Sequence, residues 1–131
     1  MAVQVQSPAR PDLRAYREAT SLAFPELVER LSHLIGKKLI AYVASVKDVR
    51  AVDRWIAGAE PYKAAERKLR LTYHIAKMLS DYEGQQVVQA WLTGLNPELH
   101  DRVPVRLLRS DDPEKAGPEL LAAARAFLAG G

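Results

Sequence analysis

Three basic residues near the middle of the chain have the types and the spacing that recognition of phosphate and base edges requires. Arg50 and Arg54 are four residues apart, which places both on one face of a predicted helix over 49–57, and Lys47 stands just before that helix. A guanidinium can read guanine or grip a phosphate, and a lysine at the helix start is expected to lie near the DNA backbone. The sequence therefore predicts a DNA-contacting surface made by Lys47, Arg50 and Arg54.

Two further positions on the same outward face fit this surface less well. The carboxylate of Asp53 would repel phosphate, and Val49 can contact only a thymine methyl group. The alternative is an ordinary helix pair inside a bundle, with Trp55 as a core aromatic. Both interpretations bury Trp55, so its truncation to alanine is expected to cost about 3–5 kcal/mol of stability.

Other residue types that could do chemistry are scattered along the chain. Each of His33, His74 and His100 lacks a second ligand at metal-binding spacing, and His74 is expected at the surface or its boundary. The absence of cysteine excludes disulfides, cysteine nucleophiles and cysteine-bound zinc. The sequence has neither a glycine-rich phosphate loop nor a Gly-x-Ser-x-Gly motif. We therefore expect a protein that is not an enzyme, with no catalytic residues, no metal site and no cofactor.

The length, composition and charge of the chain limit its number of domains and the kinds of partner it can bind. With 131 residues, of which 48% are hydrophobic, the chain suits one domain, or one domain with a short appendage. It has neither an apolar run of ~18 residues nor a signal-peptide stretch, so a cytoplasmic protein without a membrane partner is expected. Residues 30–70 hold ten Lys/Arg and four Asp/Glu, whereas residues 71–131 hold six and eight. The basic segment 30–70 beside the mildly acidic segment 71–131 indicates that the first contacts phosphate and the second contacts a different kind of partner.

The apolar periodicity indicates helices throughout, so the predicted fold class is all-α. Proline, glycine and acidic capping residues divide the chain into segments of helical spacing. The expected helices cover 12–19, 25–35, 37–45, 49–57, 61–82 and 85–92, with short stretches from 97 and from 104. A last helix is expected to begin at Asp112-Pro113. Gly117 and Pro118 are expected to interrupt it, so that its uninterrupted part is 118–129. Three regions follow: an arm without periodicity and a short helix (1–24), a helix-turn-helix region with the following long helix (25–82), and a C-terminal region (83–131).

The helix pair 37–45 and 49–57 fits the helix-turn-helix that reads DNA. Val52 and Trp55, three residues apart, would anchor the second helix to the body and leave its other face free. The turn is one residue longer than the commonest form, which has a glycine where this chain has Ser45. The N-terminal part of the chain is therefore predicted to contain a helix-turn-helix with a slightly altered turn.

An ordered series of residues resembles a known family. Its members are Arg54-Trp55-Ile56-Ala57-Gly58, Pro61, Arg70-Leu71, Trp91, Asn96-Pro97, Pro104 and Leu107-Leu108. This order, over residues 25–128, is similar to that of the Xre/MbcA/ParS antitoxins of bacterial toxin–antitoxin pairs. The resemblance implies an N-terminal helix-turn-helix of Xre type and a small C-terminal helical toxin-binding domain.

The resemblance also implies a partner and a way of acting on it. Antitoxins of this family bind a RES-type toxin, an enzyme that consumes NAD⁺, and cover its active site with their C-terminal end. In this chain that end is Phe127, Leu128, Ala129, Gly130 and Gly131. The helix-turn-helix of such proteins can bind the promoter of their own operon, so operator DNA is a second expected partner. The departures from the family pattern, in the turn and on the second helix, bear on operator binding more than on toxin binding.

The apolar residues of the C-terminal region leave alternatives open. Leu107 and Leu108 are expected to pack within the protein, whereas Phe127 and Leu128 suit a partner interface, the protein's own core or a homodimer. Three functions remain: an antitoxin that represses its own operon, a stand-alone helix-turn-helix transcriptional regulator without a toxin partner, and an interaction module that kept the fold without binding DNA.

Overall fold

The predicted all-α fold class is confirmed. The computed structural model describes residues 11–130, and that part of the chain forms eight α-helices and a short 3-10 helix, with no β-strand. The helices run over Pro11–Ser21 (α1), Phe24–Ile35 (α2), Lys37–Ala44 (α3), Val49–Ile56 (α4), Lys63–Ser80 (α5), Gln85–Thr93 (α6), Pro97–Leu99 (η1), Pro104–Ser110 (α7) and Pro113–Leu128 (α8). The arm predicted at 1–10 lies outside the described residues. Within the described range, no helix combines the length and the apolar character that crossing a bilayer needs.

Capping residues set several of the helix boundaries. The Asp48 carboxylate accepts a hydrogen bond from the backbone N–H of Arg50 (2.8 Å) at the start of α4. Asp112 does the same for α8, accepting from the backbone N–H of Glu114 (2.8 Å). Each carboxylate satisfies a backbone donor that has no partner inside the helix. Gly36, with φ of 86°, ends α2 in a conformation that favours glycine.

Two predicted boundaries were wrong. The long helix begins at Lys63 rather than at Pro61, because Tyr62 is extended (φ −64°, ψ 147°) and serves as the N-cap. The last helix is not interrupted at Gly117 and Pro118 but runs unbroken from Pro113 to Leu128. Gly117 is buried close to Leu71 of α5, where an added Cβ would lie 3.6 Å from the leucine side chain. This close packing of the first turns of α8 on α5 keeps the two halves of the helix in line.

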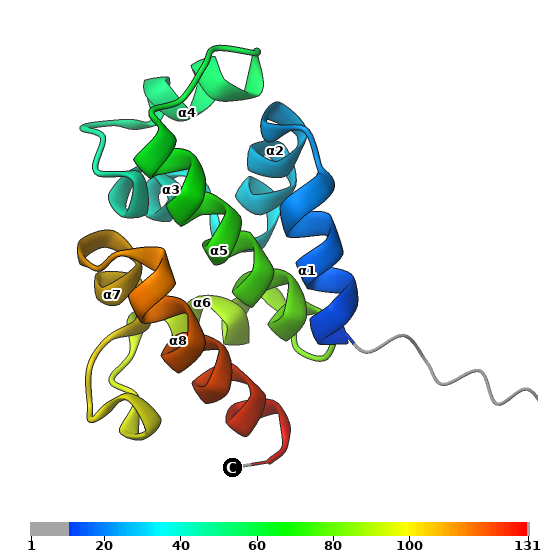
Figure 1. The fold of residues 1–131 in the computed structure, drawn as a ribbon, viewed down its shortest axis with the longest axis vertical. Coiled ribbons are helices and arrows are strands. Elements are labelled where there is room, and N and C mark those ends of the chain that lie inside the picture. Colours follow the sequence, from blue (N-terminus) through cyan, green and yellow to red (C-terminus); the bar gives the residue numbers. More distant parts are fainter. Residues whose placement is uncertain (1–10, 131) are drawn as a thin grey trace, which may run out of the picture.

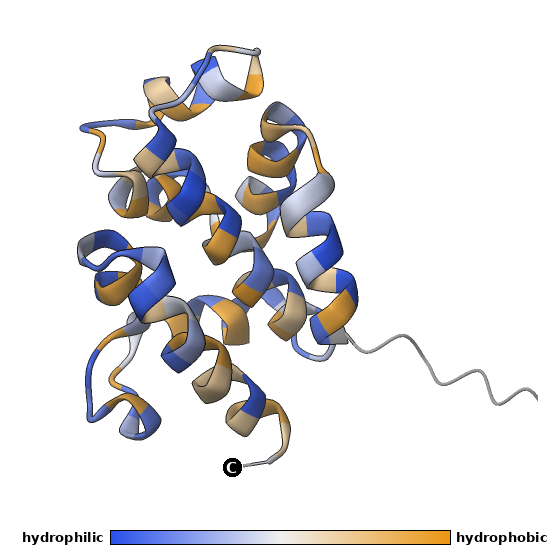
Figure 2. Ribbon diagram, in the orientation of Figure 1, coloured by the Kyte–Doolittle hydropathy of each residue, from blue (hydrophilic) through white to orange (hydrophobic). Residues whose placement is uncertain are grey.

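Helix α5 is the centre of the fold. Figure 1 shows it running through the molecule, with α1 and α2 along one side, α4 at one end and α8 along the other side. It packs against α1, α2, α3, α6, α7 and α8. In Figure 2 hydrophobic and hydrophilic segments alternate along the helices, as expected for helices buried on one face. One stripe of α5 is buried in the core, and its members are Ala65, Leu69, Tyr73, Ala76, Met78 and Leu79. One hydrophobic core extends from Ala15 to Ala124, so all three predicted regions contribute to it.

Candidate functional site

The predicted helix-turn-helix pair corresponds to α3, a turn at 45–48 and α4. Trp55 is 5% exposed, and its ring meets the ring of Phe24 edge-on, with centroids 5.9 Å apart. Val52 is fully buried. Both side chains belong to the hydrophobic core, so they anchor α4 to the body, as the spacing of three predicts, and leave its other face outward. Ser45 stands in the left-handed conformation (φ 61°, ψ 37°) at the position where the commonest form of the turn has glycine.

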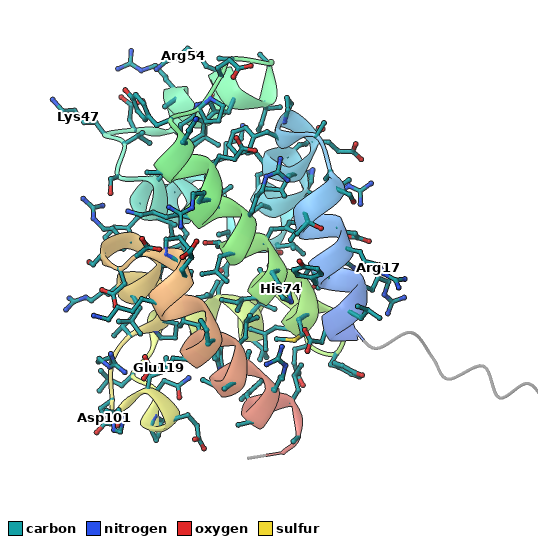
Figure 3. All side chains as sticks on the ribbon, in the orientation of Figure 1. Arg17, Lys47, Arg54, His74, Asp101 and Glu119 are labelled. Atoms are coloured by element: carbon teal, nitrogen blue, oxygen red, sulfur yellow. The ribbon has the colours of Figure 1, made fainter. Side chains whose placement is uncertain are left out.

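The three predicted DNA-contacting residues differ in how free they are. Lys47 and Arg54 are exposed at the end of the molecule formed by α4 and the preceding turn (Figure 3), and neither has an ion-pair partner within residues 11–130. Arg50 Nη2 lies 3.1 Å from Asp48 Oδ2. Hydrogen bonds from the side chain and then the backbone of Arg50 lower the pKa of Asp48. The guanidinium of Arg50 must therefore leave the Asp48 carboxylate, or share it, before it can contact DNA.

Asp53 has a partner that the sequence did not reveal. Its Oδ1 lies 2.6 Å from Nζ of Lys37, at the start of α3, and both side chains are about half exposed (51% and 44%). This pair removes most of the repulsion that a lone carboxylate would exert on phosphate. A hollow of about 490 Å³ lies beside Lys47 and Arg54 and is also lined by Tyr62. Among the residues that the structure describes, Lys47 and Arg54 thus stand without an ion-pair partner at the outward end of α4, beside the pairs Arg50–Asp48 and Lys37–Asp53.

A second candidate surface lies around the end of α8. A hollow of about 250 Å³ is lined by Trp91, Leu95, Asn96, Pro97 and Phe127, together with Ala90, Glu98 and Ala123. The Asn96 side chain is buried and caps η1 by accepting a hydrogen bond from the backbone N–H of Glu98 (2.9 Å). Leu95, in contrast, is 73% exposed. Three positions of the ordered series, 91, 96 and 97, therefore meet Phe127 around one opening.

The predicted partner-binding residues at the C-terminal end are placed in different environments. Phe127 and Leu128 are partly buried against the core, while Ala129 and Gly130 are exposed, and Gly131 lies outside the described residues. Leu128 and Ala129 line a further hollow of about 300 Å³ on the side of Tyr82. The last turn of α8 therefore stands between two hollows, one beside Phe127 and the other beside Leu128.

Leu107 and Leu108 pack within the protein, as expected. They are 8% and 1% exposed and belong to the hydrophobic core. Their burial removes these two side chains from the candidate partner surface.

The expectation for His74 was wrong, because this side chain is buried. It is 6% exposed, and its Nε2 lies 3.1 Å from Asp12 Oδ1, a residue of α1. The other oxygen of Asp12 accepts a hydrogen bond from Arg125 Nε of α8 (2.6 Å), and this bond is the largest cause that lowers the pKa of Asp12. Sequence reasoning missed this cluster because its members come from three helices and share no local motif. In the described part of the chain, no group of three His, Asp or Glu side chains could hold a metal ion.

Comparisons with protein-family models, with curated proteins and with solved structures found no match to this chain.

Proposed function

We propose that this protein is an antitoxin that binds and blocks a cognate RES-type toxin, an enzyme that consumes NAD⁺, and that it represses its own operon by binding DNA. The observation that carries the proposal is the meeting of Trp91, Asn96-Pro97 and Phe127 around one hollow beside the end of α8. Phe127 is 30 residues beyond Pro97 in the sequence, on a different helix from Trp91. Their position around one opening supports a single partner-binding surface.

The chemistry of this surface suits a protein partner. Two aromatic side chains, Trp91 and Phe127, are fixed against the core at the hollow and can serve as rigid anchors. Leu95 places an apolar side chain in solvent at its edge. Exposed apolar groups around a preformed hollow are typical of interaction surfaces, and an inhibitor needs only shape and a few polar contacts.

The alternative is a stand-alone helix-turn-helix regulator without a toxin partner. The two unpaired cations, Lys47 and Arg54, favour DNA contact at the outward end of α4, and the pairing of Asp53 with Lys37 lessens the objection to it. Both functions use the same DNA surface. Only the antitoxin requires the hollow beside Phe127, so the two are separated by variants of that hollow.

Co-expression with the product of the neighbouring gene tests the proposal. The neighbour is expected to be toxic alone, to be neutralised by this protein and to co-purify with it. Leu95→Asp is the sharpest variant, because a side chain that is 73% exposed contributes little to folding. It is expected to weaken the complex by about ten-fold or more. Val87→Asp, at an exposed apolar position of α6 outside the hollow, is the matched control and should keep full affinity.

Removal of residues 127–131 gives a second test of the same surface. It is expected to abolish inhibition while leaving the helix content nearly unchanged, since α8 would lose only its last two residues. A neighbour that is harmless alone, a failure to co-purify, or inhibition that survives both Leu95→Asp and the truncation would each contradict the antitoxin function.

DNA binding is tested separately by its salt dependence. If Lys47 and Arg54 each neutralise one phosphate, the double alanine variant lowers the slope of log affinity against log salt by about two. Lys115→Ala, at an exposed cation on α8, is the control and should leave the slope unchanged. Operator binding without any toxin would favour the stand-alone regulator. Charge reversal at Arg50 and Arg54 that leaves function intact would favour the interaction module that does not bind DNA.

A further inference from the structure

A cluster of cations lies where α7 packs against α3. Its members are Lys38 of α3, Lys68 of α5, and Arg106 and Arg109 of α7. Lys38 is one turn before Tyr42 on α3, and Arg106 is one turn before Arg109 on α7, so each pair shares a helix face. The Arg109 guanidinium lies over the Tyr42 ring, 4.6 Å from its centroid, and the two faces therefore meet at this contact.

The positive charge of this cluster is not neutralised by the protein itself. Within residues 11–130, none of its cations forms an ion pair. Two carboxylates that follow α7, those of Asp112 and Glu114, lie 3.1 and 3.7 Å from Arg67 instead. Lys38 and Arg106 are exposed, so their charges are open to a partner of opposite sign.

Hydrogen bonds to backbone carbonyls hold the centre of the cluster in place. Nη1 of Arg109 donates to the carbonyl of Tyr42 at 2.9 Å, near the C-terminal end of α3, where a cation is favoured. Nζ of Lys68 donates in turn to the carbonyl of Arg109. Because both acceptors are neutral carbonyls, these bonds orient the two cations and leave their charges uncompensated. The cluster is therefore ordered before any partner binds.

The cluster adjoins the turn of the helix-turn-helix. The carbonyl of Tyr42 that accepts from Arg109 also accepts from the backbone N–H of Ser45 at 3.1 Å, and Ser45 begins the turn that carries Lys47. Figure 1 shows α7 next to α3, on the same side of the molecule as this turn. A DNA duplex carries about one negative charge for every ~1.7 Å of its axis, so a duplex that contacts Lys47 brings further phosphates past the turn.

We propose that the cationic cluster at the junction of α3 and α7 binds the phosphate backbone of the same DNA duplex that Lys47 and Arg54 contact. This contact rests on the DNA-binding part of the proposed function and extends it from the helix-turn-helix to the C-terminal region. Phosphate contacts fix the position of a protein on the duplex and carry no sequence information, so the cluster sets affinity and orientation. Its continuity with the turn that carries Lys47 favours DNA over an acidic protein surface.

The salt dependence of DNA binding by the full chain tests the proposal. Fluorescence anisotropy measures affinity for a labelled duplex from the region upstream of the gene, and for a scrambled duplex, between about 50 and 200 mM salt. The double variant Lys38→Ala/Arg106→Ala should lower the slope of log affinity against log salt by about two on both duplexes, and Arg106→Ala alone by about one. Arg17→Ala is the matched control, because Arg17 is an exposed arginine of α1 that lies across the molecule from Lys47 (Figure 3) and should leave the slope unchanged.

The double variant Lys47→Ala/Arg54→Ala separates failure of this proposal from failure of DNA binding as a whole. If it lowers the slope while Lys38→Ala/Arg106→Ala does not, the cluster does not bind DNA, and the contact through the helix-turn-helix stands. Binding to neither duplex at about 50 mM salt would overturn both. The proposal is also overturned if Arg17→Ala lowers the slope as much as Arg106→Ala, since only net charge would then matter. An unchanged slope together with a weakened toxin complex would assign the cluster to an acidic protein surface instead.

Discussion

Truncation of Trp55 to alanine is the change expected to affect the helix-turn-helix most strongly. The side chain is 5% exposed and fills the space between α4 and α2, where it meets Phe24. Burial of an aromatic side chain of about 200 Å² at about 25 cal/mol/Å² corresponds to about 5 kcal/mol. Alanine retains about 1 kcal/mol of this, so we expect a loss of about 4 kcal/mol. A loss of this size is a large part of the stability of a domain, which is about 5–15 kcal/mol.

Urea denaturation measures this loss directly. With a slope of about 2 kcal/mol/M, the midpoint should fall by about 2 M without a change in slope. Trp91 is the only tryptophan left in the variant, so its fluorescence reports global unfolding, and circular dichroism provides a second probe. Trp91→Ala is the control, because this partly buried side chain lies beside the hollow and should cost about half as much or less. A loss below about 1 kcal/mol for Trp55→Ala would refute the anchoring of α4 through this residue.

Three further predictions concern other parts of the fold. Asp12→Ala should lower the free energy of unfolding by about 1–2 kcal/mol at neutral pH, a value that is reduced for the partial exposure of Asp12. Because folding lowers the pKa of Asp12 below 3.8, the difference in stability between wild type and variant should shrink in urea titrations as the pH falls below that value. Ser45→Gly should raise stability by about 1 kcal/mol in thermal unfolding, since φ is 61° there, whereas Ser45→Ala should not. Burial, and then its hydrogen bond to Glu18, raise the pKa of Tyr73 to about 12. Absorbance at 295 nm should therefore show one tyrosine that ionises at higher pH than the others. The free energy of unfolding should fall as the pH rises from about 10 to that value.

Local signals in the sequence account for most of the helices. Asp48, Gly36 and Asp112 act within a few residues of themselves, so the boundaries that they set can be predicted from type and spacing alone. The interruption predicted at Pro118 was wrong because local signals do not decide the conformation there. The effect of Pro118 on α8 depends on packing against α5, which is a tertiary contact that local propensity does not contain.

The candidate sites show the same division between local and tertiary information. Lys47, Arg50 and Arg54 could be placed at one end of α4 from their spacing, but the pairing of Asp53 with Lys37 joins residues 16 apart on two helices. The contacts of Asp12 with His74 and with Arg125 span 62 and 113 residues. No pattern in a single sequence predicts which polar groups such separations bring together, so the cluster of Asp12, His74 and Arg125 could be found only in the folded structure.

The most direct test of the antitoxin function is the rate of NAD⁺ consumption by the purified product of the neighbouring gene. Addition of this protein should reduce that rate to background, and Leu95→Asp should restore it while Val87→Asp should not. A neighbour that consumes NAD⁺ at the same rate with and without this protein would contradict the proposed function.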